Sequence, residues 1–226
     1  MKNTLSPLYV FFGILFTTCL LISNIVSVKL ISVGSWTITA GIILFPLSYI
    51  INDVISEIWG YKKARFIIWC GFLMNLLAIL IYTAAVAMPA SGYWNGQTGF
   101  AEVLLSTPRL AISSLLAYLA GSFINSIIMS KMKVSSKGRN FSLRAIVSTL
   151  FGESFDSILF ITIAFSGLVP FPVLVQMIAV QIVLKTMYEI LVLPLTILVV
   201  KYIRKHEGED VYDEGISYNP FKIAEV

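Results

Sequence analysis

Charged side chains stand inside stretches of this chain that are otherwise apolar enough to cross a membrane. A charged group at the middle of a bilayer costs about 2.5–3.5 kcal/mol on insertion scales, so such groups are seldom kept for stability alone. Buried carboxylates and a lysine can bind a polar ligand, pair with one another or pass a proton, and they predict a polar pocket within a helix bundle. The residues concerned are Asp53, Glu57, Glu153, Asp156, Lys185 and Glu189.

The acidic pair Glu153 and Asp156 is the strongest of these signals. The two residues lie one helical turn apart and therefore share a helix face. They follow Arg144 by about nine and twelve residues, which at 1.5 Å per residue places them near the middle of the bilayer. Two roles stay open for the pair, ligand binding and a structural connection between helices.

A second acidic pair, Asp53 and Glu57, lies at helical spacing with Tyr49 on an earlier apolar stretch. Two carboxylates one turn apart repel, so one of them is expected to hold a proton or to accept hydrogen bonds from a ligand. Asp53 lies deeper and is expected in the pocket with Tyr49. Glu57 lies near the end of its stretch, so we assign it to proton coupling or helix pairing, together with Lys29.

The last apolar stretch carries Gln181, Lys185 and Glu189 on one face. Lys185 could pair with Glu189, but lysine before glutamate is the weaker order on a helix, and the alternative is a carboxylate on another helix. A buried partner would limit the cost of desolvating the lysine. Asn24 and Asn125 are expected either to contact a ligand or to hydrogen-bond between helices.

The elements that must position these side chains are six apolar stretches, since a helix needs about 20 apolar residues to cross a bilayer. Hydrophobic residues make up 58% of the 226 residues and charged residues 12%, and the mean hydropathy is +0.88. The chain is therefore predicted to be an all-α membrane protein, a six-helix transmembrane bundle. Pro46 is expected to break the second span and Pro194 to kink the sixth. The predicted spans are Leu8–Val28, Trp36–Ile58, Phe66–Met88, Leu110–Met129, Leu143–Phe165 and Val173–Val200.

Lysine and arginine residues cluster after the second, fourth and sixth predicted spans, and the other loops hold only Lys29 and Arg109. Because basic loops stay on the cytoplasmic side, both termini are expected in the cytoplasm. We expect residues 1–205 to form one membrane domain. Residues 206–226 should form a short polar cytoplasmic tail that is loosely ordered or lies on the membrane surface.

The two halves of the chain resemble each other weakly. The first and fourth predicted spans end in ISNIVSVK at 22–29 and INSIIMSK at 124–131, and an acidic pair follows in the next span of each half. Three-span halves must have opposite orientations, as in the inverted repeats of secondary transporters. An inverted 3+3 repeat and a chance similarity of span ends both stay open.

Several functional classes are excluded by what the sequence lacks. It holds a single histidine, His206, outside the predicted spans, so no histidine-based metal site or Ser-His arrangement is expected in the bundle. No glycine-rich phosphate-binding loop is present, so the chain is not expected to hydrolyse ATP itself. We therefore expect no enzyme activity, no catalytic residue, no metal and no cofactor.

Many of the same residues fall in sequences that resemble the YhhQ family, also called the queuosine precursor transporter or vitamin uptake transporter family. The resemblance extends from about Leu8 to Lys205, with motifs in four of the six predicted spans. The matching sequences are PLSYI at 46–50 followed by Asp53, EIWG at 57–60, FINS at 123–126, ST at 148–149 with GESFDS at 152–157, and Lys185 with Glu189 and Pro194.

The resemblance implies import, through the bacterial inner membrane, of the 7-deazaguanine precursors of the tRNA nucleoside queuosine: the 7-cyano base, the 7-aminomethyl base or queuine. A guanine-like edge presents adjacent N–H donors that one carboxylate can accept together. The expected partners are this small molecule and the lipid bilayer, without nucleic acid, and such a bundle could work alone or as a homodimer. Two alternatives stay open: a substrate-binding membrane component that needs a partner, as in energy-coupling-factor importers, and a proton-coupled importer of another flat heterocycle or vitamin.

Overall fold

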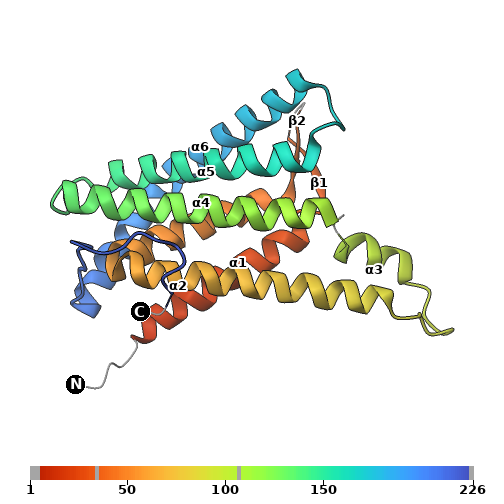
Figure 1. Ribbon diagram of the computed structural model, residues 1–226, viewed down its shortest axis with the longest axis horizontal. Coiled ribbons are helices and arrows are strands. Elements are labelled where there is room, and N and C mark those ends of the chain that lie inside the picture. The colour runs from red at the N-terminus through yellow and green to blue at the C-terminus, as the bar shows by residue number, and fades with distance from the viewer. Residues whose placement is uncertain (1–5, 34–35, 106–107, 224–226) are drawn as a thin grey trace.

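Five long apolar helices make up most of the protein (Figure 1). The computed structural model describes residues 6–33, 36–105 and 108–223. Each long helix contains a stretch apolar enough to cross a bilayer, and the protein is an α-helical, multi-pass membrane protein. The helices are α1 (Pro7–Val26), α2 (Phe45–Ala87), α4 (Pro108–Ser135), α5 (Phe141–Phe165) and α6 (Phe171–Glu207).

Helix α2 reverses its direction at Gly60 (Figure 1). Gly60 has a φ of +81° and a ψ of 172°, a conformation that favours glycine. The Trp59 ring, just before the reversal, lies 5.6 Å from the ring of Tyr9 near the start of α1. Beyond the reversal α2 follows α1 to its other end, where Asn24 hydrogen-bonds to Asn75. The basic loop expected between the second and third predicted spans is therefore a break of one residue.

A short β-hairpin precedes α2, where the sequence predicts a connection and then the start of a helix. It consists of β1 (Leu30–Val33) and β2 (Trp36–Thr39), paired antiparallel, and the 3-10 helix η1 (Ala40–Ile43) follows it. Alternating β-branched residues favour strands here. The predicted span Trp36–Ile58 is therefore wrong in its first part, because α2 begins at Phe45.

The other predicted spans overlap the observed helices. Pro46 does not break a helix as expected, because it lies in the first turn of α2, where no backbone hydrogen bond is lost. Pro194 lies inside α6, which continues to Glu207. One further short helix, α3 (Gln97–Leu104), lies in the connection between α2 and α4.

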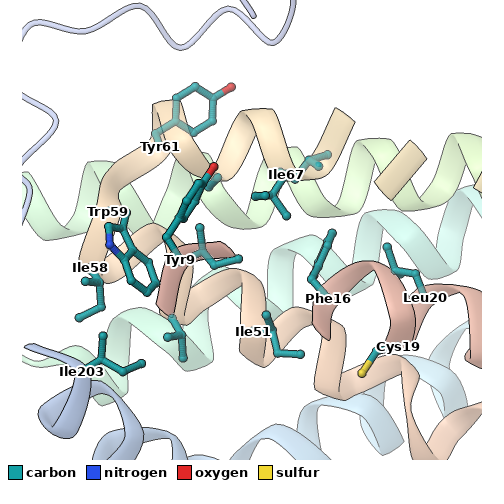
Figure 2. Close-up of a cluster of buried hydrophobic side chains, with 14 of the residues drawn as sticks. Tyr9, Phe16, Cys19, Leu20, Ile51, Ile58, Trp59, Tyr61, Ile67 and Ile203 are labelled. Carbon is teal, nitrogen blue, oxygen red and sulfur yellow. The ribbon is translucent and has the colours of Figure 1, made fainter. Parts of the chain in front are cut away.

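The hydrophobic core lies where α1 packs against both parts of α2 (Figure 2). Trp59 and Tyr61, which flank the reversal at Gly60, are 2% and 0% exposed. Tyr9 and Phe16 of α1 belong to the same cluster. Large apolar side chains on the outer faces of the helices are exposed, as expected for surfaces that face lipid.

The bundle has two different ends (Figure 1). We call one the tail end: it holds the start of α1, Gly60, the α4–α5 connection and the C-terminal segment Gly208–Ile223. The other, the hairpin end, holds β1, β2 and α3. The sequence leaves the tail either loosely ordered or on the membrane surface; in the structure the C-terminal segment packs against the helices, with Asp213 only 7% exposed.

Candidate functional site

Three helices bring five of the six predicted charged residues together inside the bundle. Asp53 comes from α2, Glu153 and Asp156 from α5, and Lys185 and Glu189 from α6; we call these five the acidic cluster. Each is at most 8% exposed. Glu189 lies close enough to Asp53 and Glu153 to interact electrostatically with both. The structure thus assembles one polar site from residues far apart in the sequence.

Asp53 is held by hydrogen bonds from two other helices. Asn125 of α4 donates its Nδ2 to Oδ1 of Asp53 at 2.7 Å, and Thr149 of α5 donates its Oγ1 to Oδ2 at 3.4 Å. All three side chains are completely buried. Both carboxylate oxygens are therefore oriented by the protein, and Asn125 acts here between helices.

Lys185 pairs across helices with Asp156 and not with Glu189. Its Nζ lies 2.5 Å from Oδ2 of Asp156. The same ammonium lies 4.3 Å from the centre of the Phe45 ring, a distance at which a cation is attracted to an aromatic face. Of the two alternatives that the sequence leaves open, the structure has the interhelical pair.

Glu153 and Glu189 differ from the other carboxylates of the cluster. Both are 0% exposed, and no oxygen of either side chain accepts a hydrogen bond within the described residues. A buried carboxylate without donors is costly. The cost is removed when the group takes a proton or when a ligand brings N–H donors. Among the carboxylates of the cluster, these two are therefore the ones that can still take up a proton or accept hydrogen bonds from a ligand.

Tyr49 of α2 lies beside the cluster, where α4 and α5 approach each other closely. A Cβ atom on Gly152 would come within 2.8 Å of the carbonyl oxygen of Gly121, so only glycines allow this approach. A Cβ on Gly121 would collide with the hydroxyl of Tyr49 and lie 2.9 Å from Cβ of Asp156. The Tyr49 hydroxyl itself has no hydrogen-bond partner among the described residues. The two glycines thus place an aromatic ring and a free hydroxyl at the site.

Gly121→Ala is expected to destabilise the protein, because the added methyl group must displace Tyr49. Overpacking of this kind costs about 1–3 kcal/mol. Thermal unfolding of purified protein in detergent measures the loss, and Gly99→Ala is the matched control, since a Cβ at Gly99 meets nothing within 4 Å. An unchanged melting temperature for Gly121→Ala would mean that Tyr49 is not fixed by this contact.

Glu57 belongs to a separate charged group at the tail end. It accepts hydrogen bonds from both terminal nitrogens of Arg144 on α5, at 2.5 and 2.9 Å, and from Arg204 on α6 at 2.7 Å. Its side chain is completely buried. In this geometry Glu57 connects three helices, which is the helix pairing that the sequence leaves open beside proton coupling. Sequence reasoning missed both arginines as partners, because it treated them only as flanks of predicted spans.

Asn24 and Lys29 lie apart from the acidic cluster, and Gln181 precedes Lys185 by one turn of α6. Asn24 donates to Asn75 at 2.5 Å and is largely exposed on α1. Lys29 is exposed near the hairpin end, the opposite end from Glu57. Gln181 is half-buried, and its side chain makes no hydrogen bond within the described part of the chain.

The chain resembles known membrane transporters over most of its length. A family described as "Putative vitamin uptake transporter" matches residues 39–199. The chain is 26% identical over 149 residues to the "Probable queuosine precursor transporter" of Bacillus subtilis, covering 66% of this chain and 65% of that protein. It is 29% identical over 135 residues to the "Queuosine precursor transporter" of Escherichia coli, covering 60% and 58%.

These alignments span less than two thirds of the length of either relative. No solved structure matches the chain. All five residues of the acidic cluster lie within the segment that matches the family, whereas the C-terminal segment lies outside it.

Proposed function

The chain belongs to the vitamin uptake transporter family, and from this premise we propose that it imports queuosine precursors across the membrane. The relatives that it matches carry names for this transport. The single observation that carries the proposal is the pair of fully buried carboxylates, Glu153 and Glu189, that lack donors within the described residues. Their oxygens can accept hydrogen bonds that no described residue donates, although protein surrounds them.

The proposed ligand is a 7-deazaguanine base, with the 7-cyano base, the 7-aminomethyl base and queuine as candidates. Its guanine-like edge presents adjacent N–H donors, which a carboxylate accepts in a charge-assisted pair. Glu153 or Glu189 would accept this edge, and Tyr49 would lie against the flat ring. Asp53 and the Lys185–Asp156 pair would complete the polar wall. The two hydrogen bonds that the carboxylate gains when the base binds would also offset the free-energy cost of burying it.

We propose that the membrane is the bacterial inner membrane and that the tail end faces the cytoplasm. The basic residues after the second, fourth and sixth predicted spans all fall toward this end, which supports that orientation. The opposite directions of the two parts of α2 favour six crossings and leave room for an inverted 3+3 repeat. The tail, residues 206–226, would then be cytoplasmic.

Import is tested in a bacterial host that neither makes 7-deazaguanines nor has an importer for them. The host expresses this chain and receives nanomolar 7-cyano-7-deazaguanine, and queuosine in its tRNA is read from mobility on a boronate gel. Restored modification is the expected result. Its absence with folded, inserted protein would remove this substrate class.

Purified protein in liposomes separates the proposal from a substrate-binding component that needs a partner. A complete importer accumulates radiolabelled base inside the vesicles, whereas a partner-dependent component binds the base and does not translocate it. The Gly121→Ala variant provides an internal comparison, because its displaced Tyr49 should reduce uptake along with stability.

A further inference from the structure

The C-terminal segment supplies the hydrogen bonds that the reversal of α2 leaves open. A helix that stops leaves unpaired N–H groups at its start and carbonyl groups at its end. At Gly60 the N–H of Tyr61 donates to Oδ2 of Asp213 at 2.8 Å, and the N–H of Val211 donates to the carbonyl of Ile58 at 3.2 Å. The segment therefore caps both helical parts of α2 at once.

The same segment is also bound to α4. Ser130 donates its hydroxyl to Oδ2 of Asp213 at 2.6 Å. Lys133, 2% exposed, donates to Oδ1 of Asp210 at 2.5 Å and to the carbonyl of Val211 at 2.8 Å. It also donates to the backbone carbonyl of Glu57 on α2. The segment thus lies across the junction of α2 and α4 and links the two helices there.

Between this junction and the acidic cluster, the contact of α2 with α4 includes a run of short polar side chains beside the apolar ones. Asn52 donates to the carbonyl of Ser122 at 3.2 Å, and the hydroxyls of Ser56 and Ser126 are 3.1 Å apart. One turn away, Asn125 holds Asp53 of the cluster. We call Asn52, Ser56, Ser122 and Ser126 the polar seam. When the helices part, water or a polar ligand can replace the partner of each of these side chains, because a hydrogen bond to water is nearly as favourable as the one that is lost.

We propose that the C-terminal segment is a gate on this seam. While it is docked at Gly60 it holds α2 and α4 together and closes the route from the acidic cluster to the tail end. When it leaves, the ends of both parts of α2 lose their caps and the seam opens. The inference rests on the proposed function and adds the control of access to the same site.

The attachment of the segment fits a part that moves. It joins α6 through Gly208, which has a φ of +65° and open space around its Cα. Gly215, with a φ of +69°, gives the segment a second point of the same kind. Changes of a few backbone dihedrals at such positions are what hinge motions use. Between these hinges, Asp213 is the buried anchor and its neighbour Glu214 is exposed.

The gate is tested by labelling a cysteine placed in the seam, Ser126→Cys, after Cys19→Ala and Cys70→Ala remove the native thiols. A water-soluble maleimide is added to the purified protein in detergent, where both ends are accessible. Asp213→Asn should raise the labelling rate about tenfold, because it weakens a charge-assisted hydrogen bond to Tyr61. Glu214→Gln, one residue away, should leave the rate unchanged.

A disulfide then fixes the segment in its docked position. Ile58→Cys with Val211→Cys is suitable, because the backbone hydrogen bond between these residues brings their Cα atoms within disulfide reach. Oxidation of this pair should suppress the fast labelling at position 126 in Asp213→Asn, and reduction followed by removal of the reductant should restore it. The label at position 126 is read by peptide mass spectrometry, because the reduced cysteines at 58 and 211 also react. Fast labelling that persists after oxidation, or equal rates for Asp213→Asn and Glu214→Gln, would overturn the gate. No substrate enters either measurement, so this result and the uptake result fail independently.

Discussion

Glu153→Gln is expected to abolish high-affinity binding of the 7-deazaguanine base without lowering the stability of the protein. A hydrogen bond to a charged group contributes about 1.5–3 kcal/mol, which corresponds to roughly a tenfold to 150-fold loss of affinity. The loss should be larger still where the amide nitrogen of glutamine faces a donor of the base. Because no donor among the described residues contacts Glu153, the substitution breaks no hydrogen bond there, and removing a buried charge should hold or raise the melting temperature.

Equilibrium binding of radiolabelled base to purified protein, beside its thermal unfolding, measures both effects. Ser154→Ala is the matched control, since Ser154 is the next residue on α5 but is only half-buried, and its side chain bonds only to its own helix. Glu189→Gln is expected to behave like Glu153→Gln. A variant that keeps its affinity but melts earlier would show that Glu153 holds helices together and does not bind the ligand.

Glu57→Gln is expected to give the opposite result, a large loss of stability. The substitution leaves Arg144, 1% exposed, without its carboxylate partner. Removing one member of a buried ion pair costs about 3–5 kcal/mol. Arg204 loses the same partner, although it keeps Asp210 at 3.2 Å. The protein should therefore express poorly and unfold at a clearly lower temperature.

Chemical or thermal unfolding in detergent follows this loss, with Glu102→Gln on α3 as a control for removing an exposed carboxylate. Substitution of Glu153 in the site and of Glu57 at the tail end should therefore give different results. Binding should fall at constant stability for Glu153, and stability should fall first for Glu57. If Glu57→Gln unfolds like Glu102→Gln, the arginine pairs do not stabilise the tail end.

The acidic cluster could largely be predicted from the sequence, because each of its residues is anomalous in its own apolar stretch. Helical spacing placed Glu153 and Asp156 on one face, and burial of a lone lysine called for a partner such as Asp156. What spacing cannot supply is the identity of partners on other helices. Glu57 and Arg204 are 147 residues apart, and their contact depends on the packing of the whole bundle.

A reversal between Ile58 and Phe66 was predicted, but its one-residue length at Gly60 and the hairpin were missed for a different physical reason. Turns are usually recognised from runs of polar, glycine and proline residues. Gly60 stands alone between Trp59 and Tyr61, two core residues, and the groups that complete the turn come from Val211 and Asp213. β2 is apolar and β-branched enough to pass for the start of a span, and β1 lies in the predicted connection before it. In both places tertiary contacts, and not local composition, decide the structure.

The capping of Gly60 by residues near the other end of the chain has a consequence for biosynthesis. Chains are made from the N-terminus, so both parts of α2 are synthesised long before Val211 and Asp213 leave the ribosome. Until then the turn carries an unpaired N–H at Tyr61 and an unpaired carbonyl at Ile58. The nascent protein therefore holds its first helices in an unfinished state, and a ribosome that stops early releases a chain that proteases can distinguish from a finished one.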